Sequence, residues 1–221
     1  MTEPQRKTSW KQDPDAVRQD ILSVAIREFG EHGLSGARVD EIARKTRTSK
    51  RMIYYYFVDK EGLYQNALQR EYDRLRDDRA ALKLDALPPI EALRKLTEFM
   101  FDWHRVNLDF VRMVVIENAL GARHLRQSKT MDGRGAAVTG PLQDLLTRGV
   151  DEGVFRTGVD PVILHMTMTG VSFYNTSNRH TFPLIFGEEV RSDAQQGALR
   201  DALVRMVFGL VLKPKAFAKT V

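Results

Sequence analysis

Apolar residues recur at intervals of three and four along most of the chain, which is the spacing of a helix with one buried face. The first such segment begins at Asp13-Pro14, where an aspartate N-cap precedes a proline in the first helical position. Its apolar face consists of Val17, Ile21, Val24, Ala25 and Phe29. The pattern predicts a first helix that Gly30 and Gly33 end.

Two short helices joined by a tight turn are predicted over residues 39–57. In the first, three apolar residues share one side, and two acids occupy the first turn, where carboxylates suit the positive helix end. These residues are Val39, Ile42 and Ala43, with Asp40 and Glu41. The segment Thr46-Arg47-Thr48 then breaks the pattern. Ser49 is a good N-cap for the second helix, in which the apolar residues Ile53 and Phe57 are four positions apart.

The segment that joins these helices is basic and contains no acid. Lysine and arginine neutralise phosphates, while hydroxyls and backbone N–H groups at a helix start bind phosphate oxygens or base edges. The basic residues are Arg44, Lys45, Arg47, Lys50 and Arg51, and the hydroxyls belong to Thr46, Thr48 and Ser49. The pattern predicts a recognition helix that enters a DNA groove by its N-terminal end. The alternative is an ordinary solvated helix face.

At these positions the chain resembles the TetR family of transcriptional regulators, over roughly residues 15–65. The matching residues are Gly33, Ile42-Ala43, Ser49, Tyr54, Phe57, Lys60-Glu61 and Leu63-Tyr64. Two positions depart from the family pattern: Arg47 stands in a turn where Gly is frequent, and Arg38 stands where Thr or Ser often precedes the first short helix. If the turn needs a positive φ, Arg47 carries a steric cost that Gly would avoid.

The basic segment and the resemblance together predict the residues that contact DNA. They are Arg38, Arg44, Arg47, Thr48, Ser49, Lys50, Arg51, Tyr54, Tyr55 and Lys60. Lys50, Arg51 and Tyr54 are expected to face the major groove or its flanking phosphates. Ile53 and Phe57 are expected to face the protein interior.

The rest of the chain is also predicted to be helical. Helices are expected over residues 59–84, 89–103, 110–116, 141–150, 161–174 and 199–210. Residues 110–116 are apolar on nearly every side and could form a buried strand, but the chain offers no partner strand, which favours a helix. Residues 121–140 are expected to hold a helix break or loop, Gly149 and Gly153 to close the helix before them, and Pro214 to stop the last helix. The predicted fold is all-α, with about nine helices.

Two domains are expected within this fold. Residues 1–58 would form a helix-turn-helix DNA-binding domain, in which residues 1–12 are a flexible basic arm. Residues 59–221 would form a helical domain for effector binding and dimerisation. The helix that starts at Lys60 leaves the first domain for the second, so we expect it to act as the lever between them.

Composition agrees with a DNA-binding protein and excludes thiol chemistry. The 221 residues carry a net charge of +5, and the chain has 43% hydrophobic residues, as a globular protein does. The absence of cysteine excludes disulfides, thiol catalysis and thiolate zinc sites. The polar first thirteen residues do not form a signal peptide, and no stretch has the length of a transmembrane helix, so a cytoplasmic protein without membrane contact is expected.

The histidines give little support to a metal site or an enzyme. His32, His104, His124, His165 and His180 lack the i, i+4 pairing of metal ligands. Glu117 could still converge with some of them on a metal, although polar groups paired in the core are the better interpretation. No phosphate loop or nucleophile elbow is present. We therefore predict no catalytic residues, no metal and no cofactor.

A second group of residues could line a cavity for a small molecule. It combines aromatic and thioether side chains with a few polar ones, as small-molecule sites do. The candidates are Phe99, Met100, Trp103, Phe110, Met113, Glu117, Asn118, His165, Phe173 and Tyr174. The alternative is that they are core residues. The resemblance implies an effector cavity in the C-terminal domain, and Glu117 is expected either to pair with a neighbouring Arg or His or to orient the ligand.

The function predicted from these features is a ligand-responsive transcriptional repressor that a small molecule releases from a double-stranded DNA operator. A homodimer is expected through residues 161–178 and 197–212, whose apolar residues cover more than one face. Val162, Met166 and Phe173 would contribute from the first segment, and Leu203, Val207 and Leu210 from the second. One alternative is a regulator with a closed cavity and another kind of signal. The other is a small-molecule or metal-dependent enzyme with a vestigial DNA-binding domain.

Overall fold

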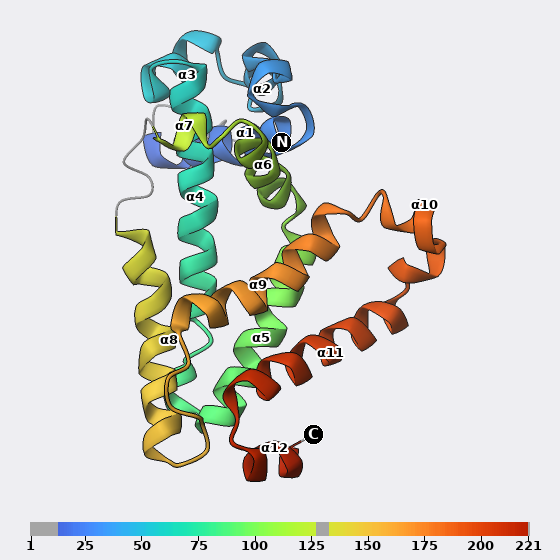
Figure 1. The fold of residues 1–221 in the computed structure, drawn as a ribbon. Helices are drawn as coiled ribbons and strands as arrows, with labels where there is room; N and C mark the ends of the chain where they lie inside the picture. Colours follow the sequence, from blue (N-terminus) through green and yellow to red (C-terminus); the bar gives the residue numbers. More distant parts are fainter. Residues whose placement is uncertain (1–12, 127–132, 221) are drawn as a thin grey trace, which may run out of the picture. The chain divides into compact units, whose positions relative to one another are not determined.

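The structure is a computed structural model that describes residues 13–126 and 133–220 (Figure 1). The chain divides into two compact units, Met1–Arg70 and Glu71–Val221. The change from one unit to the other lies inside helix α4, Lys60–Ala80, so the domain boundary predicted between residues 58 and 59 stays a prediction. The predicted basic arm, residues 1–12, lies outside the described residues.

The first unit contains three helices and the start of α4. They are α1 (Pro14–Gly36), α2 (Val39–Lys45) and α3 (Lys50–Phe57). Their apolar faces meet in a core that is closed to solvent. Its fully buried residues include Ile21, Phe29, Ile42, Ile53 and Tyr64. The rings of Phe29 and Tyr64 pack edge to face, with centroids 5.0 Å apart, and so join α1 to α4. The two predicted short helices are confirmed.

Helix α1 begins as predicted, and of the two glycines predicted to end it only Gly33 breaks it. The Asp13 carboxylate accepts a hydrogen bond from the backbone N–H of Ala16 at 2.9 Å, as an N-cap does. Gly30 is buried inside the helix and does not end it. The break comes at Gly33, whose φ of 64° and ψ of 177° are not helical. Glycine adopts this positive φ at no steric cost, so the chain can turn there toward α2.

The second unit contains the rest of α4 and eight further α-helices. They are α5 (Pro89–Val106), α6 (Leu108–Ala119), α7 (Arg123–Arg126), α8 (Arg134–Asp151), α9 (Pro161–Ser177), α10 (Phe182–Phe186), α11 (Asp193–Val211) and α12 (Pro214–Thr220). Two 3₁₀ turns, η2 (Leu84–Ala86) and η4 (Glu188–Arg191), lie between them. Within this unit α9 packs against α5, α8 and α11 (Figure 1).

The all-α fold is confirmed, and the described residues contain twelve α-helices where about nine were expected. The apolar segment 110–116 is helical within α6. Prolines account for two differences. Helix α8 begins at Arg134 and runs through Pro141, which was expected to start it, and Pro214 begins the short helix α12 instead of only ending α11. Proline suits a first helical turn because its missing N–H is not needed there.

An apolar cluster from α5, α8, α9 and α11 forms the core of the second unit. Its members include Leu93, Phe101, Leu145, Leu164, Leu203, Val207 and Phe208. Phe155 belongs to the same cluster and pairs with Leu212 in an isolated antiparallel bridge. Gly149 contacts the ring of Phe155 so closely that a Cβ atom there would overlap the ring. Gly149 is therefore needed for packing inside α8 and does not close the helix. None of the helices described is both long and apolar enough to cross a membrane.

Candidate nucleic-acid interface and ligand cavities

The N-terminal end of α3 is built as an exposed helix start. Ser49 has extended backbone angles, φ −104° and ψ 152°, and its hydroxyl accepts a hydrogen bond from the N–H of Met52 at 3.2 Å. Lys50 and Arg51 are exposed, whereas Ile53 and Phe57 are 0% and 2% exposed. The basic side of α3 thus faces solvent, and its apolar side holds the helix on the first unit.

The turn between α2 and α3 has a left-handed residue at Arg47, with φ 52°. The N–H of Thr46 donates to Ile42 O at 3.0 Å, and the N–H of Thr48 donates to Ala43 O at 3.0 Å. The hydrogen bonds close the turn on both sides of Arg47 and leave its side chain exposed. A left-handed conformation costs a residue with a Cβ about 1 kcal/mol. The turn therefore does need the positive φ that glycine would adopt without strain.

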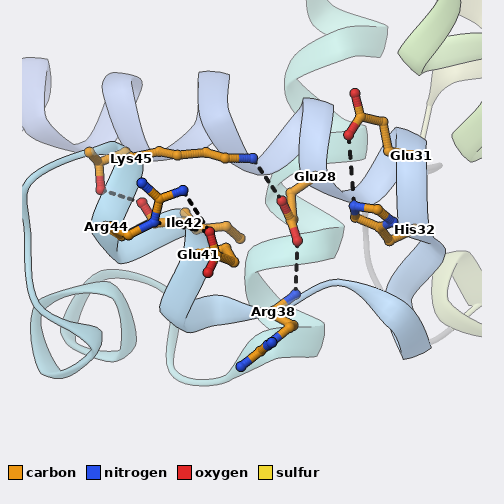
Figure 2. Close-up of polar contacts among 9 residues, drawn as sticks. Glu28, Glu31, His32, Arg38, Glu41, Ile42, Arg44 and Lys45 are labelled. Carbon is orange, nitrogen blue, oxygen red and sulfur yellow. Dashed lines mark hydrogen bonds and ion pairs between the residues drawn. The ribbon is translucent and has the colours of Figure 1, made fainter.

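Three of the basic residues in the Arg44–Arg51 segment are paired with acids from elsewhere in the first unit. Arg44 pairs with Glu41 at 2.8 Å, and Lys50 pairs with Asp40 at 3.2 Å. Lys45 pairs with Glu28 at 3.1 Å, as Figure 2 shows. The segment has no acid in sequence, but folding brings acids to it from α1 and α2.

The arginines Arg38, Arg47 and Arg51 are exposed and form no ion pair within the described part of the chain. No acid of the described residues therefore neutralises their charge at short range. Lys60, in the first turn of α4, donates from Nζ to Ser35 O at 3.3 Å. Tyr55 is 77% exposed, while Thr48 and Tyr54 are half-buried. All ten predicted DNA-contacting residues thus lie on α2, α3, the turn between them or the helix starts beside it.

Glu28 of α1 holds the start and the end of α2 in place, a role that the sequence analysis missed (Figure 2). Its side chain is 3% exposed, and its two carboxylate oxygens accept hydrogen bonds from Arg38 N at 3.1 Å and from Lys45 Nζ at 3.1 Å. Burial alone would raise the pKa of Glu28, but these two donors and the charges of Lys45 and His32 lower it below its ordinary value. An acid inside the buried face of α1 was the signal available in the sequence.

The aromatic residues predicted to bind an effector pack against each other in the second unit. Trp103 and Phe110 are 4% exposed, and their rings lie edge to face with centroids 5.1 Å apart. Phe99 and Phe173 pack on the same cluster. The indole N–H of Trp103 donates to Asp78 Oδ2 at 2.9 Å, so its polar atom is already bonded within the protein. Met100 and Met113 are also buried, at 2% and 0% exposure.

The polar residues Glu117, Asn118 and Tyr174 of that predicted set differ in their burial. Glu117 is 1% exposed and accepts a hydrogen bond from the Leu125 N–H at 3.3 Å, and one of its oxygens lies 2.7 Å from His124 Nδ1. The expected pairing of Glu117 with a neighbouring histidine is therefore present. Asn118 and Tyr174 are exposed instead.

Two histidines lie close together inside the second unit. His104 is 3% exposed, and its Nδ1 lies 2.9 Å from the Ser172 hydroxyl. Burial, with a smaller contribution from the charge of His165, lowers the pKa of His104 to about 4. The pKa of His165 is also lowered, first by burial and then by Arg79. Burial therefore favours the neutral form of both rings.

The largest cavity that we describe has a volume of about 400 Å³ and lies among α4, η2, α5 and α8. Its lining is Arg76, Arg79, Ala80, Leu84, Asp85, Leu96, Ala137, Pro141, Leu142, Asp144, Leu145 and Arg148. A second cavity, of about 130 Å³, lies where the end of α9 meets α10, η4 and α11. None of the ten predicted effector residues lines either cavity. The arginines that line the larger cavity lie on the charged side of α4 and on α8, and those that line the second cavity lie on α5, after α9 and in η4.

No group of three His, Asp or Glu side chains in the described residues is arranged to hold a metal ion. The five histidines therefore do not gather at one site among the described residues. His104 and His124 have polar partners in the core, and His180 is exposed.

Two family models match most of the chain. The model described as "Bacterial regulatory proteins, tetR family" matches residues 21–67, and the model described as "Tetracyclin repressor-like, C-terminal domain" matches residues 89–207. Together they include α2, α3, most of α1 and nearly all of the segment from α5 to α11.

Relatives with assigned names are similar over most of their length. The HTH-type transcriptional repressor NicS of Pseudomonas putida is 31% identical over 177 residues, which cover 80% of this chain and 84% of NicS. The repressor AcnR of Corynebacterium glutamicum is 28% identical over 154 residues, 69% of this chain and 76% of AcnR.

Solved structures have the same fold. A transcriptional regulator of Streptomyces coelicolor, SCO4942, aligns with a TM-score of 0.64 and 27% identity over 90% of this chain and 99% of its own. FadR of Bacillus subtilis, solved in complex with stearoyl-CoA, aligns with a TM-score of 0.61 and 17% identity over 86% of this chain and 96% of its own. At that identity the second likeness concerns the fold alone.

Proposed function

This chain belongs to the TetR family of DNA-binding transcriptional regulators, and we propose that it is a homodimeric repressor that a small molecule releases from its operator. The observation that carries the proposal is the capped, exposed N-terminal end of α3, beside which Arg47 and Arg51 have no acidic partner among the described residues. The relatives named as repressors support the direction of regulation.

Operator binding would use α3 in the major groove. Ile53 and Phe57 fix the helix on the first unit, which leaves Lys50, Arg51 and Tyr54 to contact base edges or phosphates. The paired residues Arg44 and Lys50 can exchange an exposed carboxylate for a phosphate, because surface ion pairs contribute only about 0–1 kcal/mol. Arg47 and Arg51 need no such exchange and should dominate the electrostatic part of binding.

Exposed apolar residues on α9 and α11 support a homodimer through these helices. Val162, Ile163, Met166 and Tyr174 of α9 are between 49% and 65% exposed, and Met206 of α11 is 54% exposed. A two-fold interface would bury them and set two α3 helices about 34 Å apart, as a two-fold operator requires. Leu203 and Val207 were predicted for this interface, but they are 0% exposed in the core of one chain and are not available to a partner.

The effector site that we propose is the 400 Å³ cavity of the second unit, which has a volume in the range of small-molecule sites. Its walls are mostly apolar, and Arg79 forms no ion pair within the described residues. Burial lowers the pKa of Arg79, so an anion beside it would restore a favourable environment for its charge. An amphipathic carboxylate satisfies both features. The aromatic set around Trp103 stays the alternative location.

Helix α4 is the element that we propose couples the two sites. It starts at Lys60 in the first unit, and its later residues Arg76 and Arg79 line the cavity. Effector and operator binding must then weaken each other reciprocally, typically by about 1–3 kcal/mol. The chain would act in the cytoplasm. It would need no catalytic activity, because regulation of this kind needs only two binding sites and the helix between them.

The test is selection of DNA from a random pool by the full-length protein, followed by sequencing and binding measurements at several salt concentrations. Enrichment of a two-fold sequence bound by two copies of the chain supports the proposal. Binding that shows no sequence preference would contradict it. Measurement of transcription from a promoter that contains the enriched sequence then distinguishes repression from activation.

A further inference from the structure

The 130 Å³ cavity of the second unit has a composition unlike that of the proposed effector cavity. Three arginines line it: Arg105 near the end of α5, Arg179 just after α9, and Arg191 in η4. Phe182 of α10 forms an apolar part of the wall. None of its residues was predicted to bind a ligand, and none belongs to the larger cavity.

The positive charge in this cavity is only weakly compensated by the protein. Arg105 lies 3.6 Å from Asp193 and 3.8 Å from Asp102, and Arg191 lies 3.7 Å from Glu188. These distances are too long for hydrogen bonds. Arg179 forms no ion pair in the part of the chain that the structure describes, and burial together with the charges of Arg191 and Arg112 lowers its pKa.

A second observation, independent of the charges, also points to a missing ligand. Thr176 of α9 lines the cavity and is 5% exposed, and its hydroxyl has no hydrogen-bond partner among the described residues. Most threonines inside helices bond a carbonyl one turn earlier, as Thr169 does with His165 O at 2.8 Å. The oxygen itself is buried behind the cavity wall. A buried hydroxyl without a partner costs about 1–3 kcal/mol, and rotation of the side chain toward the cavity would let a ligand satisfy it.

The cavity wall is held in shape by a hydrogen-bonded amide pair. Asn175 Nδ2 donates to Gln196 Oε1 at 2.8 Å, and Gln196 Nε2 donates to Val190 O at 2.8 Å. These contacts join α9, η4 and α11 around the cavity. The site is therefore preorganised, and the amides are satisfied without a ligand, unlike the hydroxyl of Thr176 and the guanidinium of Arg179.

We propose that this cavity binds a small oxyanion, a carboxylate or a phosphate group, through the guanidinium of Arg179 and the hydroxyl of Thr176. Arginine presents a planar fork of donors that matches such oxygens, and the threonine hydroxyl supplies a further donor. The volume limits the rest of the ligand, because a cavity of roughly 150 Å³ accommodates a benzene ring. Because the cavity opens to solvent, this limit applies to the part of the ligand inside it, a compact anionic group that lies partly against Phe182.

The test is isothermal titration of the full-length protein with sodium benzoate and with inorganic phosphate, each compared with sodium chloride at matched ionic strength. Saturable binding of either probe beyond the chloride control is the expected result. Tighter binding of benzoate identifies the organic carboxylate as the ligand class, and tighter binding of phosphate identifies the phosphate group. Neither probe binding beyond the control would overturn the proposal.

Three variants locate the binding. Arg179→Gln should raise the dissociation constant about tenfold or more, because a charge-assisted hydrogen bond is lost. Thr176→Val should raise it several-fold, yet leave the thermal midpoint of the probe-free protein unchanged or higher, because it removes an unsatisfied buried hydroxyl. Arg205→Gln, an exposed arginine of α11 outside the cavity, is the matched control and should change nothing. Unchanged affinity in both Arg179→Gln and Thr176→Val would contradict the proposed site.

Discussion

The guanidinium of Arg79 in α4 donates a hydrogen bond from Nη2 to the carbonyl oxygen of Ala137 in α8, with 2.6 Å between the atoms. In a regular helix that carbonyl accepts the N–H of the residue four positions later, but residue 141 is proline and has none. Arg79 therefore supplies the donor that Pro141 lacks. This helps α8 to continue through a residue that usually breaks or kinks a helix.

This relationship predicts a coupling between Arg79 and Pro141. Arg79→Ala should lower the free energy of unfolding by about 0.5–1.5 kcal/mol, because the Ala137 carbonyl loses its donor. In a Pro141→Ala background, residue 141 regains an N–H that can bond Ala137, so the same change should cost clearly less. Urea denaturation of the four proteins measures the difference. Equal costs of Arg79→Ala in both backgrounds would show that the hydrogen bond is not a replacement for the missing one.

The recognition helix is tested by the double variant Lys50→Ala with Arg51→Ala. Each lost phosphate contact should reduce the slope of log K against log salt by about one unit in each half-site. Operator affinity at low salt should fall accordingly. Fluorescence anisotropy with the selected operator at several salt concentrations gives both quantities. Arg27→Ala, an exposed arginine of α1, is the control, and an unchanged slope in the double variant would exclude α3 as the reading helix.

Replacing the turn residue Arg47 by glycine should raise the stability of the protein and lower its affinity for DNA. Replacement by glycine removes the steric cost of a φ of 52°, and after glycine's greater entropy in the unfolded chain it should leave a gain of up to about 0.5 kcal/mol. The same change removes a cation without an acidic partner, so operator binding should weaken. Arg47→Ala loses the charge but keeps the strain, and serves as the comparison. If Arg47→Gly were no more stable than Arg47→Ala, the turn would not depend on the left-handed conformation.

Glu28 should make stability depend on pH in the acidic range. Its pKa is lowered in the folded protein, so its contribution to the free energy of unfolding is fully present above the unfolded pKa, near 4.5, and is lost as pH falls toward the folded value. Glu28→Gln should therefore be less stable than the natural chain at pH 7, and the difference should shrink below about pH 4.5. The free energy of unfolding of both proteins can be measured by denaturation from pH 3.5 to 7. A difference between them that stayed constant over this range would contradict the prediction.

The location of the effector site can be decided with two neighbouring alanines of α8. Ala136 and Ala137 are both exposed, but only Ala137 lines the larger cavity. In the presence of a panel of straight-chain carboxylates, Ala137→Leu should raise the concentration needed to release the operator about tenfold, because the larger side chain fills the cavity. Ala136→Leu should behave as the natural chain.

Trp103→Ala tests the alternative location of the effector site, the aromatic set around Trp103. If Trp103→Ala abolished release while Ala137→Leu did not affect it, the ligand would bind in the aromatic set and not in the larger cavity. Both variants should bind the operator normally without effector, which separates a lost ligand site from a lost DNA-binding domain.

Local sequence determined the elements of this protein, because helix starts and apolar faces depend on neighbouring residues. Asp13-Pro14 and Asp160-Pro161 place N-caps where the structure has them, and the spacing of Ile53 and Phe57 identifies the buried side of α3. The basic segment from Arg44 to Arg51 and the signature residues around it also identified the family. Each of these signals spans only a few residues.

What the sequence did not determine depends on residues that are distant along the chain. No local pattern brings Glu28 to Lys45, Arg79 to Ala137, or Thr176 to a cavity shared with Arg105. Aromatic residues were predicted to line a cavity, and that assignment stays a prediction. In the structure Trp103 and Phe110 pack against each other, because large apolar side chains gain most when they contact each other. Which basic residues keep an unpaired charge, and where space remains between helices, are decided only when the tertiary structure brings donors and acceptors together.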